Sequence, residues 1–335
     1  MLKTVKVLVV LALLSALGGG FYIYNYGKNP PGKIKEGVVM EIEPGSSFTS
    51  ISKKLEKKGI LENERMFYLY AKIRGLQSKA KAGEYLIEPA MSTDEILDRL
   101  VRGSVITHRI TIPEGYNIYQ VADMLEEKKI TKKKDFIKKA KDKNFMASLN
   151  VKGVSLEGYL YPETYFFFKG MKTEEIMRQM VNRFHTVFTD DLKKKSKAMG
   201  FTMEEVVTLA SIIEKETGNP DERPLISAAF HNRLKKKMRL QSDPTTIYGI
   251  IETFDGNLRR KDLLQKTPYN TYKISGLPLG PIANPGIESI KAALNPADVD
   301  YIFFVSMNNG SHIFAKTYKE HNKNVWKYQK SGRNR

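Results

Sequence analysis

Leu209-Ala210-Ser211-Ile212-Ile213-Glu214-Lys215-Glu216-Thr217 is the stretch that decides how this 335-residue chain is interpreted. Upstream of it, Thr202 is followed three residues later by Glu205, which is the capping-box pattern of a helix N-terminus. The sequence therefore predicts a helix from about Met203 to about Thr217, ended by Gly218-Asn219-Pro220.

Two acidic residues flank the apolar face of this predicted helix. At about 100° per residue, Glu214 and Glu216 fall on opposite sides of the apolar stripe. A carboxyl group beside a buried apolar run can have a raised pKa, which a general acid needs. An ion pair with Arg223 or Arg233 would be an inert alternative. The stripe itself consists of Val206, Leu209, Ala210 and Ile213.

The residues downstream favour a built site. A second helix is predicted over residues 224–238, and a third is predicted to begin at Asp243 as N-cap with Pro244 in its first turn. Two proline-rich loops follow, over residues 267–272 and 276–286. Ordered loops that combine prolines with polar side chains often carry functional residues.

The N-terminus has the pattern of a membrane anchor. Lys3 and Lys6 precede an uncharged run from Val7 to Tyr24, and aromatic residues crowd its far end. This predicts a single span over residues 1–26 with a cytoplasmic N-terminus, and places the remainder outside the cytoplasm. The alternative is a cleaved signal peptide, for which Ala16-Leu17-Gly18 is a poor cleavage site. Residues 27–40, with Asn29-Pro30-Pro31-Gly32, are predicted to be a linker.

The composition narrows the classes of function. The net charge of +18 favours an anionic partner such as nucleic acid, anionic lipid or an acidic envelope polymer, and the anchor argues against nucleic acid. No cysteine is present, so disulfides and thiolate zinc sites are excluded. The five histidines show no metal-binding spacing, and neither a metal nor another cofactor is expected.

A weak internal repeat follows the linker. Residues 41–60 match residues 111–130 at a constant offset of 70, and each copy reads as a strand, a glycine turn and a short amphipathic helix. A strand at residues 81–87 and a helix at residues 93–100 are predicted between the copies. Residues 41–148 resemble LysM-like glycan-binding modules, with a plain spacer domain as the alternative.

A boundary near residue 150 separates this region from a stretch rich in aromatic residues and acids, Leu156 to Tyr165. Aromatic rings stack on the apolar faces of sugars, and carboxylates accept their hydroxyl groups. Glu157 and Glu163 are therefore candidate substrate-binding residues. A half-buried strand and turn explains Phe166, Phe167 and Phe168 better than a binding role does.

Five motifs together resemble the MltG/YceG-like family of endolytic murein transglycosylases, over almost the whole chain. They are Leu209 to Thr217, Asn232-Arg233-Leu234, Arg239 to Thr245, Pro268 to Tyr272 and Gly280 to Gly286. One departure is Leu279, where the family usually has proline. The resemblance implies an inner-membrane anchor, a LysM-like region and a catalytic domain. The predicted fold is thus α+β, with a transmembrane helix (1–26), small α/β units (41–148) and a mainly helical α+β catalytic domain (149–330).

The resemblance also implies a reaction. The β-1,4 bond between N-acetylmuramic acid and N-acetylglucosamine is cleaved within a strand without water, which gives a 1,6-anhydromuramyl end and terminates strand elongation. Glu214 is the implied catalytic residue. Substrate-binding roles are predicted for Glu216, Asn232, Arg233, Gln241, Asp243, Thr245, Tyr269 and Asn270. Ser211, Gln241 or Asn270 would hold the acetamido group.

Three other functions stay open at this point. A membrane-tethered scaffold would grip glycan without cleaving it, and a binder of nucleic acid or another anionic polymer would use the lysine clusters. A water-using muramidase would need a second carboxylate, for which Glu157, Glu163 and Asp243 are the candidates. The expected partners are peptidoglycan strands and the membrane, with peptidoglycan synthases or division proteins as further candidates.

Overall fold

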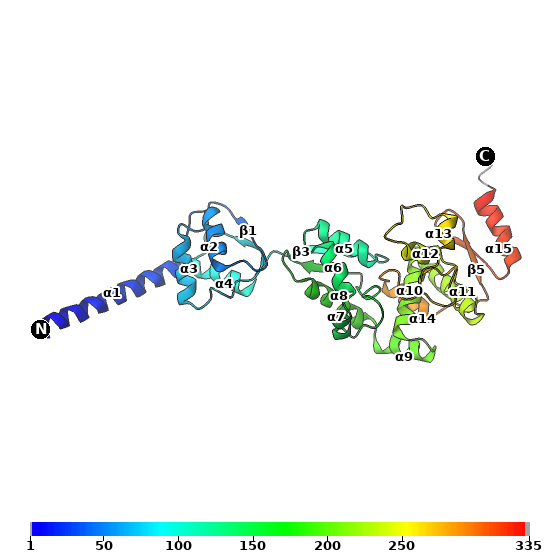
Figure 1. The fold of residues 1–335 in the computed structure, drawn as a ribbon, viewed down its shortest axis with the longest axis horizontal. Coiled ribbons are helices and arrows are strands. Elements are labelled where there is room, and N and C mark those ends of the chain that lie inside the picture. The colour runs from blue at the N-terminus through cyan, green and yellow to red at the C-terminus, as the bar shows by residue number, and fades with distance from the viewer. Residues whose placement is uncertain (1, 332–335) are drawn as a thin grey trace. The chain divides into compact units, whose positions relative to one another are not determined.

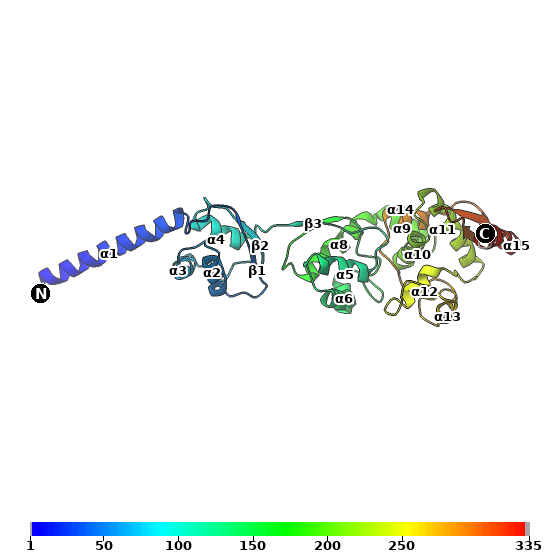
Figure 2. The same cartoon turned by 90° about the horizontal axis from the view of Figure 1, so that it is seen from above.

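The computed structural model describes residues 2–331, which form two compact units. The first unit contains the chain up to Arg109 together with Phe166–Met171, and the second contains Ile110–Tyr165 and the chain from Lys172 onward. Both units combine helices with short strands (Figures 1 and 2). The predicted α+β class is confirmed.

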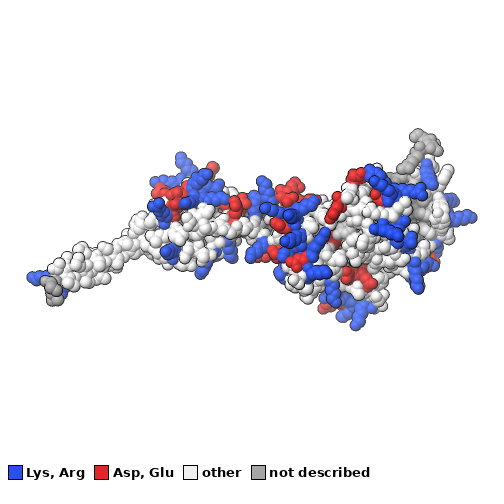
Figure 3. Space-filling model, in the orientation of Figure 1, with Lys and Arg blue, Asp and Glu red and all other residues white. Residues whose placement is uncertain are grey.

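Helix α1 (Leu2–Lys28) is long and apolar enough to cross a membrane. It is also the kind of helix that a signal sequence forms, because it lies near the N-terminus. Its large apolar side chains are exposed, and Figure 3 shows it without charge between its basic beginning and the first unit. Its last turn packs on the first unit, where the rings of Tyr26 and Tyr70 meet edge-on at 5.6 Å.

The predicted linker is packed along the first unit. The amide of Thr93 donates to the Asn29 carbonyl at 3.0 Å, and the amide of Glu62 donates to the Pro31 carbonyl at 2.8 Å. Gly32 lies so close to the Ile60 carbonyl that an added Cβ would be 2.3 Å from its oxygen. Residues 29–32 therefore form an ordered connection, because neighbouring backbone groups satisfy their carbonyls.

The first unit surrounds a two-stranded antiparallel sheet. Strand β1 (Val38–Ile42) pairs with β2 (Gly83–Ile87), with Met40 opposite Tyr85. Helices α2 (Phe48–Lys57), α3 (Glu64–Ile73) and α4 (Thr93–Arg102) bury their apolar faces in one core with this sheet. The strand and helix predicted between the repeats are thus β2 and α4.

The internal repeat is confirmed by the element bounds. Helix α5 (Ile118–Glu127) has the bounds of α2 shifted by 70 residues at both ends, and it lies between β3 (His108–Thr111) and α6 (Lys133–Ala140). The glutamate near the end of each first helix caps the next one: Glu56 accepts from the Glu64 amide and Glu126 from the Lys133 amide. Strand β4 (Thr164–Phe167) forms a two-stranded sheet with β3, and α8 (Thr173–Val187) follows β4.

The second copy of the repeat belongs to the second unit. The boundary between the two compact units lies at Arg109, whereas the sequence predicted one near residue 150. Between α6 and β4 lies one short helix, α7 (Lys143–Ser148). The reason for the different division is that the β3–α5 turn makes backbone hydrogen bonds with residues near position 284, described below, which join this copy to the C-terminal helices.

The remaining helices of the second unit gather around α10 (Met203–Glu216). Its predicted capping box is present, and every residue from Val206 to Ile213 is buried, so the helix is enclosed on all sides and not only along one stripe. It packs against α14 (Ile287–Leu294) and α11 (Arg223–Lys235). The other elements are α9 (Asp190–Ala198), a 3-10 turn (Pro220–Glu222), α12 (Asp243–Gly249), α13 (Arg260–Leu264), β5 (Phe303–Ser306), β6 (His312–Ala315), α15 (Tyr318–Val325) and a π-helical turn (Trp326–Lys330).

One helix start differs from the prediction. Ser242, not Asp243, occupies the N-cap of α12, and no side chain caps this helix. Asp243 lies one position later, where its carboxylate accepts a hydrogen bond from the Tyr272 hydroxyl at 2.7 Å. The Asp243 carboxylate therefore binds Tyr272, which is distant in sequence, and does not cap the helix.

Candidate active site

Glu214 lies in the last turn of α10, and its side chain is only 7% exposed. Its Oε2 accepts a hydrogen bond from the Gly286 amide at 3.1 Å, at the N-terminus of α14. Its Oε1 lies 3.8 Å from Nη2 of Arg223, which begins α11. The ends of three helices therefore meet at this carboxyl group, and both groups that face it carry positive or partly positive charge.

A second carboxyl group, that of Glu114, reaches the same place. An added Cβ on Gly286 would be 1.9 Å from Oε1 of Glu114, so the Glu114 carboxyl lies directly over this glycine. Burial and the nearby Glu214 carboxyl raise the pKa of Glu114, and Arg223 opposes this rise. Glu114 is not among the site residues predicted from the sequence. A comparison of the two copies of the repeat distinguishes this residue, because the first copy has Pro44 where the second copy has the acid Glu114.

Asn284 fixes the loop that carries Gly286. It is fully buried, and its backbone carbonyl accepts from the Gly115 amide at 2.9 Å while its own amide donates to the Tyr116 carbonyl at 2.9 Å. Its side chain donates to the Tyr116 carbonyl and accepts from the Leu160 amide. Asn284 thus holds Glu114 and Gly286 in register.

Ser211 holds the same loop from the helix side. Its hydroxyl accepts a hydrogen bond from the Ile282 amide at 3.0 Å and donates to the Thr208 carbonyl at 2.7 Å. Ser211 is fully buried, and its hydrogen bonds are made to the backbone. It therefore positions the loop over residues 280–286 against α10.

Glu157 is 1% exposed, and its carboxyl group lies next to the Asn284 side chain. Its carboxyl group accepts from the Ile118 amide at 2.9 Å, from the Tyr248 hydroxyl at 2.9 Å and from the Asn284 side chain at 3.2 Å. Burial raises the pKa of Glu157 to about 8, although these hydrogen bonds oppose the rise. Through its hydrogen bonds to Ile118 and Tyr248, Glu157 connects the N-terminus of α5 to α12.

Glu216 faces away from Glu214, as the helix geometry predicts. The Ser242 hydroxyl donates to its Oε1, and burial raises its pKa to about 7. The nearby Asp243 adds to the rise, while Ser242 and Arg233 oppose it. The two acids of the motif thus lie in two different environments, Glu214 at the start of α14 and Glu216 beside the start of α12.

Asn232 and Arg233 bind backbone carbonyls. The Asn232 side chain donates to the carbonyls of residues 299 and 301. Arg233 donates through Nε to the Ile302 carbonyl and through Nη1 to the Leu240 carbonyl, both at 2.6 Å. Gln241 lies beside Arg233, at 3.5 Å from Nη1, with a left-handed φ of 51°. These contacts bind the segment before β5 and the connection between α11 and α12 to the same helix, α11.

Thr245 and Asn270 are fully buried. Thr245 donates to the Ser242 carbonyl, and Asn270 donates to the Gln265 carbonyl and accepts from the Thr246 hydroxyl. Side chains without exposed surface shape the loops and offer nothing to a ligand in this structure. Tyr269 differs, because it lines a cavity.

Glu163 forms an ion pair with Arg183 of α8. Its carbonyl also accepts from the Ile112 amide at 2.9 Å. The acids proposed for a second carboxylate therefore have separate partners: Arg183 for Glu163, Tyr272 for Asp243 and the α5 N-terminus for Glu157. Within residues 2–331, no group of three or more acids and histidines is arranged to hold a metal.

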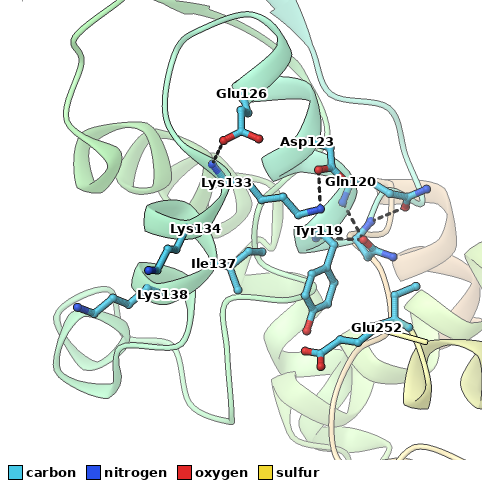
Figure 4. Close-up of a pocket in the computed structure, with 11 residues that line it drawn as sticks. Tyr119, Gln120, Asp123, Glu126, Lys133, Lys134, Ile137, Lys138 and Glu252 are labelled. Atoms are coloured by element: carbon cyan, nitrogen blue, oxygen red, sulfur yellow. Dashed lines mark hydrogen bonds and ion pairs between the residues drawn. The ribbon is translucent and has the colours of Figure 1, made fainter. Parts of the chain in front are cut away.

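A cavity of about 920 Å³ lies between α5, α6 and the loop after α12 (Figure 4). The Tyr119 ring extends toward Glu252 in it, and Lys133 of α6 pairs with Asp123 of α5 at 2.6 Å. An adjoining cavity of about 520 Å³ shares Tyr119 and also contains Tyr248 and Tyr269. The Tyr248 and Tyr269 rings meet edge-on at 4.8 Å. The two cavities share Tyr119 and Glu252, and together they form a groove that combines tyrosine rings with charged side chains.

Comparison with known proteins identifies the family. The model of the YceG-like family matches residues 40–327. The chain belongs to the YceG-like family. An endolytic murein transglycosylase of Bacillus subtilis is 36% identical over 333 residues, which cover 93% of this chain and 91% of that relative. An endolytic murein transglycosylase of Streptococcus pneumoniae is 30% identical over 359 residues, 96% of this chain and 64% of the relative.

A solved structure supports the YceG-like assignment. The crystal structure of a YceG-like protein from Listeria monocytogenes matches 87% of this chain and 99% of its own, with a TM-score of 0.59 and 36% identity. The resemblance inferred from the five motifs is therefore confirmed at the level of the family and of the α+β fold.

Proposed function

We propose that this chain is an endolytic lytic transglycosylase that cleaves the β-1,4 bond between N-acetylmuramic acid and N-acetylglucosamine within peptidoglycan strands. Family membership and the activity for which the relatives are named support the reaction class. The observation that carries the assignment of the site is the Glu214 carboxyl, 7% exposed where α10, α11 and α14 meet.

Glu214 is the proposed catalytic residue. Its carboxyl group donates a proton to the glycosidic oxygen as the bond to C1 breaks, and then takes the proton of the sugar's own C6 hydroxyl as that oxygen closes on C1. The product is a 1,6-anhydromuramyl end, and no water is consumed. The intramolecular attack provides a high effective concentration of the nucleophile. General acid-base assistance of this kind contributes roughly 10²–10⁴-fold in rate.

The groove around Tyr119 is the proposed contact with glycan beyond the bond that is cleaved. Aromatic rings and acids are combined there. One side of the groove, which includes Tyr119, comes from the second copy of the repeat, and the other side comes from the end of α12 and residues that follow it. Of the motif residues, Tyr269 is the one proposed to contact saccharide in this groove. Tyr119→Ala should weaken binding to insoluble peptidoglycan at moderate salt. The matched control is Tyr68→Ala, on α3 of the first unit.

Helix α1 is the proposed anchor of a single-pass protein with its N-terminus in the cytoplasm and both units outside. Lys3 and Lys6 before the apolar run support this orientation. Terminal sequencing of the membrane fraction should find the chain starting at Met1. A mature protein that starts near Gly19 would show a cleaved signal instead. Synthases and division proteins remain proposed partners.

The decisive experiment is mass spectrometry of purified glycan strands after digestion with the full chain. An anhydro end differs from a hydrolysed end by one water. Anhydro ends that vanish in Glu214→Gln, with an unchanged Tm, would support the proposal. Hydrolysed ends would favour a water-using muramidase. Tight glycan binding without any new ends would favour a scaffold.

A further inference from the structure

Two carboxyl groups converge on the backbone of Gly286. Its amide lies 3.1 Å from Oε2 of Glu214, and the position of its missing Cβ lies 1.9 Å from Oε1 of Glu114. Backbone geometry separates the amide nitrogen from that position by about 2.5 Å, so the two carboxyl oxygens lie within about 7.5 Å of each other. Pairs of catalytic carboxyls in glycoside-cleaving enzymes are separated by roughly 5–9.5 Å.

A glycine is required where they meet. Any side chain at position 286 would occupy the place of the Glu114 carboxyl. The turn that carries Glu114 is also fixed from the α10 side, because Nζ of Lys215 donates to the Gly115 carbonyl at 3.2 Å. Glu114 is thus held at the site by α10, by the loop that ends in Gly286 and by its own turn.

The internal repeat indicates that this carboxyl is not needed for the fold of the unit. The first copy has Pro44 at the position of Glu114 and still forms the same strand, turn and helices. The following glycines, Gly45 and Gly115, have φ values of 82° and 75°, so the two turns share a backbone conformation. Glu114 is therefore an addition to a turn that folds without it.

The two carboxyls have different surroundings. Glu214 accepts the Gly286 hydrogen bond and faces Arg223, whereas no hydrogen bond within residues 2–331 reaches the Glu114 carboxyl. The charged and titratable groups around Glu114 are Glu214 and Lys215 of α10, Arg223 of α11, Glu288 of α14 and Tyr161. Nε of Arg223 is buried, and among the described residues it has no hydrogen-bond partner.

This asymmetry suits a division of the proton transfers. Donors around a carboxyl group favour its ionised form, and burial beside a second carboxyl favours the protonated form. Burial and Glu214 raise the pKa of Glu114 accordingly. Glu214 is placed to accept a proton, and Glu114 is placed to supply one.

We propose that Glu114 is the second catalytic carboxyl of the site and takes over from Glu214 the role of proton donor. Glu114 donates the proton to the glycosidic oxygen, and the Glu214 carboxylate acts only as the base that takes the proton of the C6 hydroxyl. This inference rests on the proposed function. The bond from C1 to the leaving oxygen breaks, and the bond from O6 to C1 forms. One proton moves from Glu114 to the leaving oxygen and one from O6 to Glu214. Proton exchange with solvent then resets the pair.

The test compares Glu114→Gln, Glu214→Gln and the double variant of the full chain on purified glycan strands. Each single change should lower kcat by about 10²-fold or more. The kcat of the double variant should be no more than a few-fold below that of the less active single variant, because the two groups act as a unit. Glu127→Gln, an exposed acid at the end of α5, is the matched control and should stay within about twofold of wild type.

The pH profile separates a catalytic role from a structural one. Wild-type kcat should fall at high pH as Glu114 loses the proton that it donates. In Glu114→Gln the residual activity should lose the high-pH limb, with the Tm within about 2 °C of wild type. Wild-type kcat and pH profile in Glu114→Gln, with Glu214→Gln inactive, would overturn this inference and leave the proposed function intact. If the wild-type protein itself produced no anhydro ends, both this inference and the proposed function would be wrong.

Discussion

Asn284 donates from Nδ2 to Oε1 of Glu157 at 3.2 Å, across 127 residues of sequence. This hydrogen bond joins the loop that ends at Gly286 to the turn that supports α5. Because the Asn284 backbone also pairs with Gly115 and Tyr116, one residue holds together three segments of the site. Asn284 holds the turn that carries Glu114 next to the loop that ends at Gly286, although Asn284 has no exposed surface to offer a substrate.

Asn284→Ala should destabilise the second unit and distort the site. The change leaves the buried Leu160 amide without its partner, which costs about 1–3 kcal/mol. It also removes one of the hydrogen bonds of the Tyr116 carbonyl and one of the Glu157 carboxyl, each worth about 0.5–1.5 kcal/mol. We expect the free energy of unfolding to fall by about 2–4 kcal/mol in chemical denaturation. Asn182→Ala, an exposed position on α8, is the control and should change it by less than about 0.5 kcal/mol. Equal stability of the two variants would show that the loop is held by other contacts.

The stability of the second unit should fall as the pH rises. The pKa of Glu157 is about 8 in the folded protein against an ordinary value of 4.5. Between these two values the folded state keeps a proton that the unfolded chain has lost, so the free energy of unfolding decreases with increasing pH. Above about pH 8 both states are ionised and this dependence ends.

Glu157→Gln should flatten this dependence, because an amide does not titrate. Thermal melts from pH 4.5 to 8.5 would measure it, with Glu127→Gln as the exposed control. The remaining slope should come from Glu216, whose pKa of about 7 acts with the same sign in a narrower window. A slope in Glu157→Gln as steep as that of the wild type would contradict the assignment.

Glu216→Gln should act more mildly on catalysis than Glu214→Gln. Glu216 is bonded to Ser242 on the other side of α10, so its loss alters the start of α12 and leaves the Gly286 contact in place. We expect kcat to fall by less than about tenfold, compared with about 10²-fold or more for Glu214→Gln. Anhydro-product assays would decide. An inactive Glu216→Gln beside an active Glu214→Gln would reverse the assignment within the motif.

Lys129→Gly should stabilise the second copy of the repeat. Lys129 has a left-handed φ of 57°, and the first copy has Gly59 with φ of 73° at the matching position. This left-handed conformation costs a non-glycine residue about 1 kcal/mol relative to glycine. The gain is partly offset by the freedom of glycine in the unfolded chain, so we expect about 0.5 kcal/mol in denaturation. Gly59→Ala should cost the first unit about 1 kcal/mol. A loss of stability in Lys129→Gly would show that the Lys129 side chain contributes more than the strain costs.

Local patterns in the sequence predicted most of the elements. The capping box at Thr202 and Glu205 located the start of α10, because the hydrogen bonds of a cap are made within four residues. The offset of 70 residues predicted α5 from α2 with identical bounds. At Asp243 the local rule failed, because Tyr272, a tertiary partner, binds the carboxylate. The five motifs were enough to identify the YceG-like family.

The sequence by itself determined the helices, the repeat, the family and the candidacy of Glu214. All of these follow from patterns within a few residues or from matched motifs. Only the tertiary structure decided which side chains meet. It brings Glu114 to Glu214 from 100 residues away, gives Glu157 and Asn270 buried partners, and packs residues 29–32 onto the first unit. Such contacts depend on which buried polar groups satisfy one another across the fold, and local periodicity carries no information about that pairing.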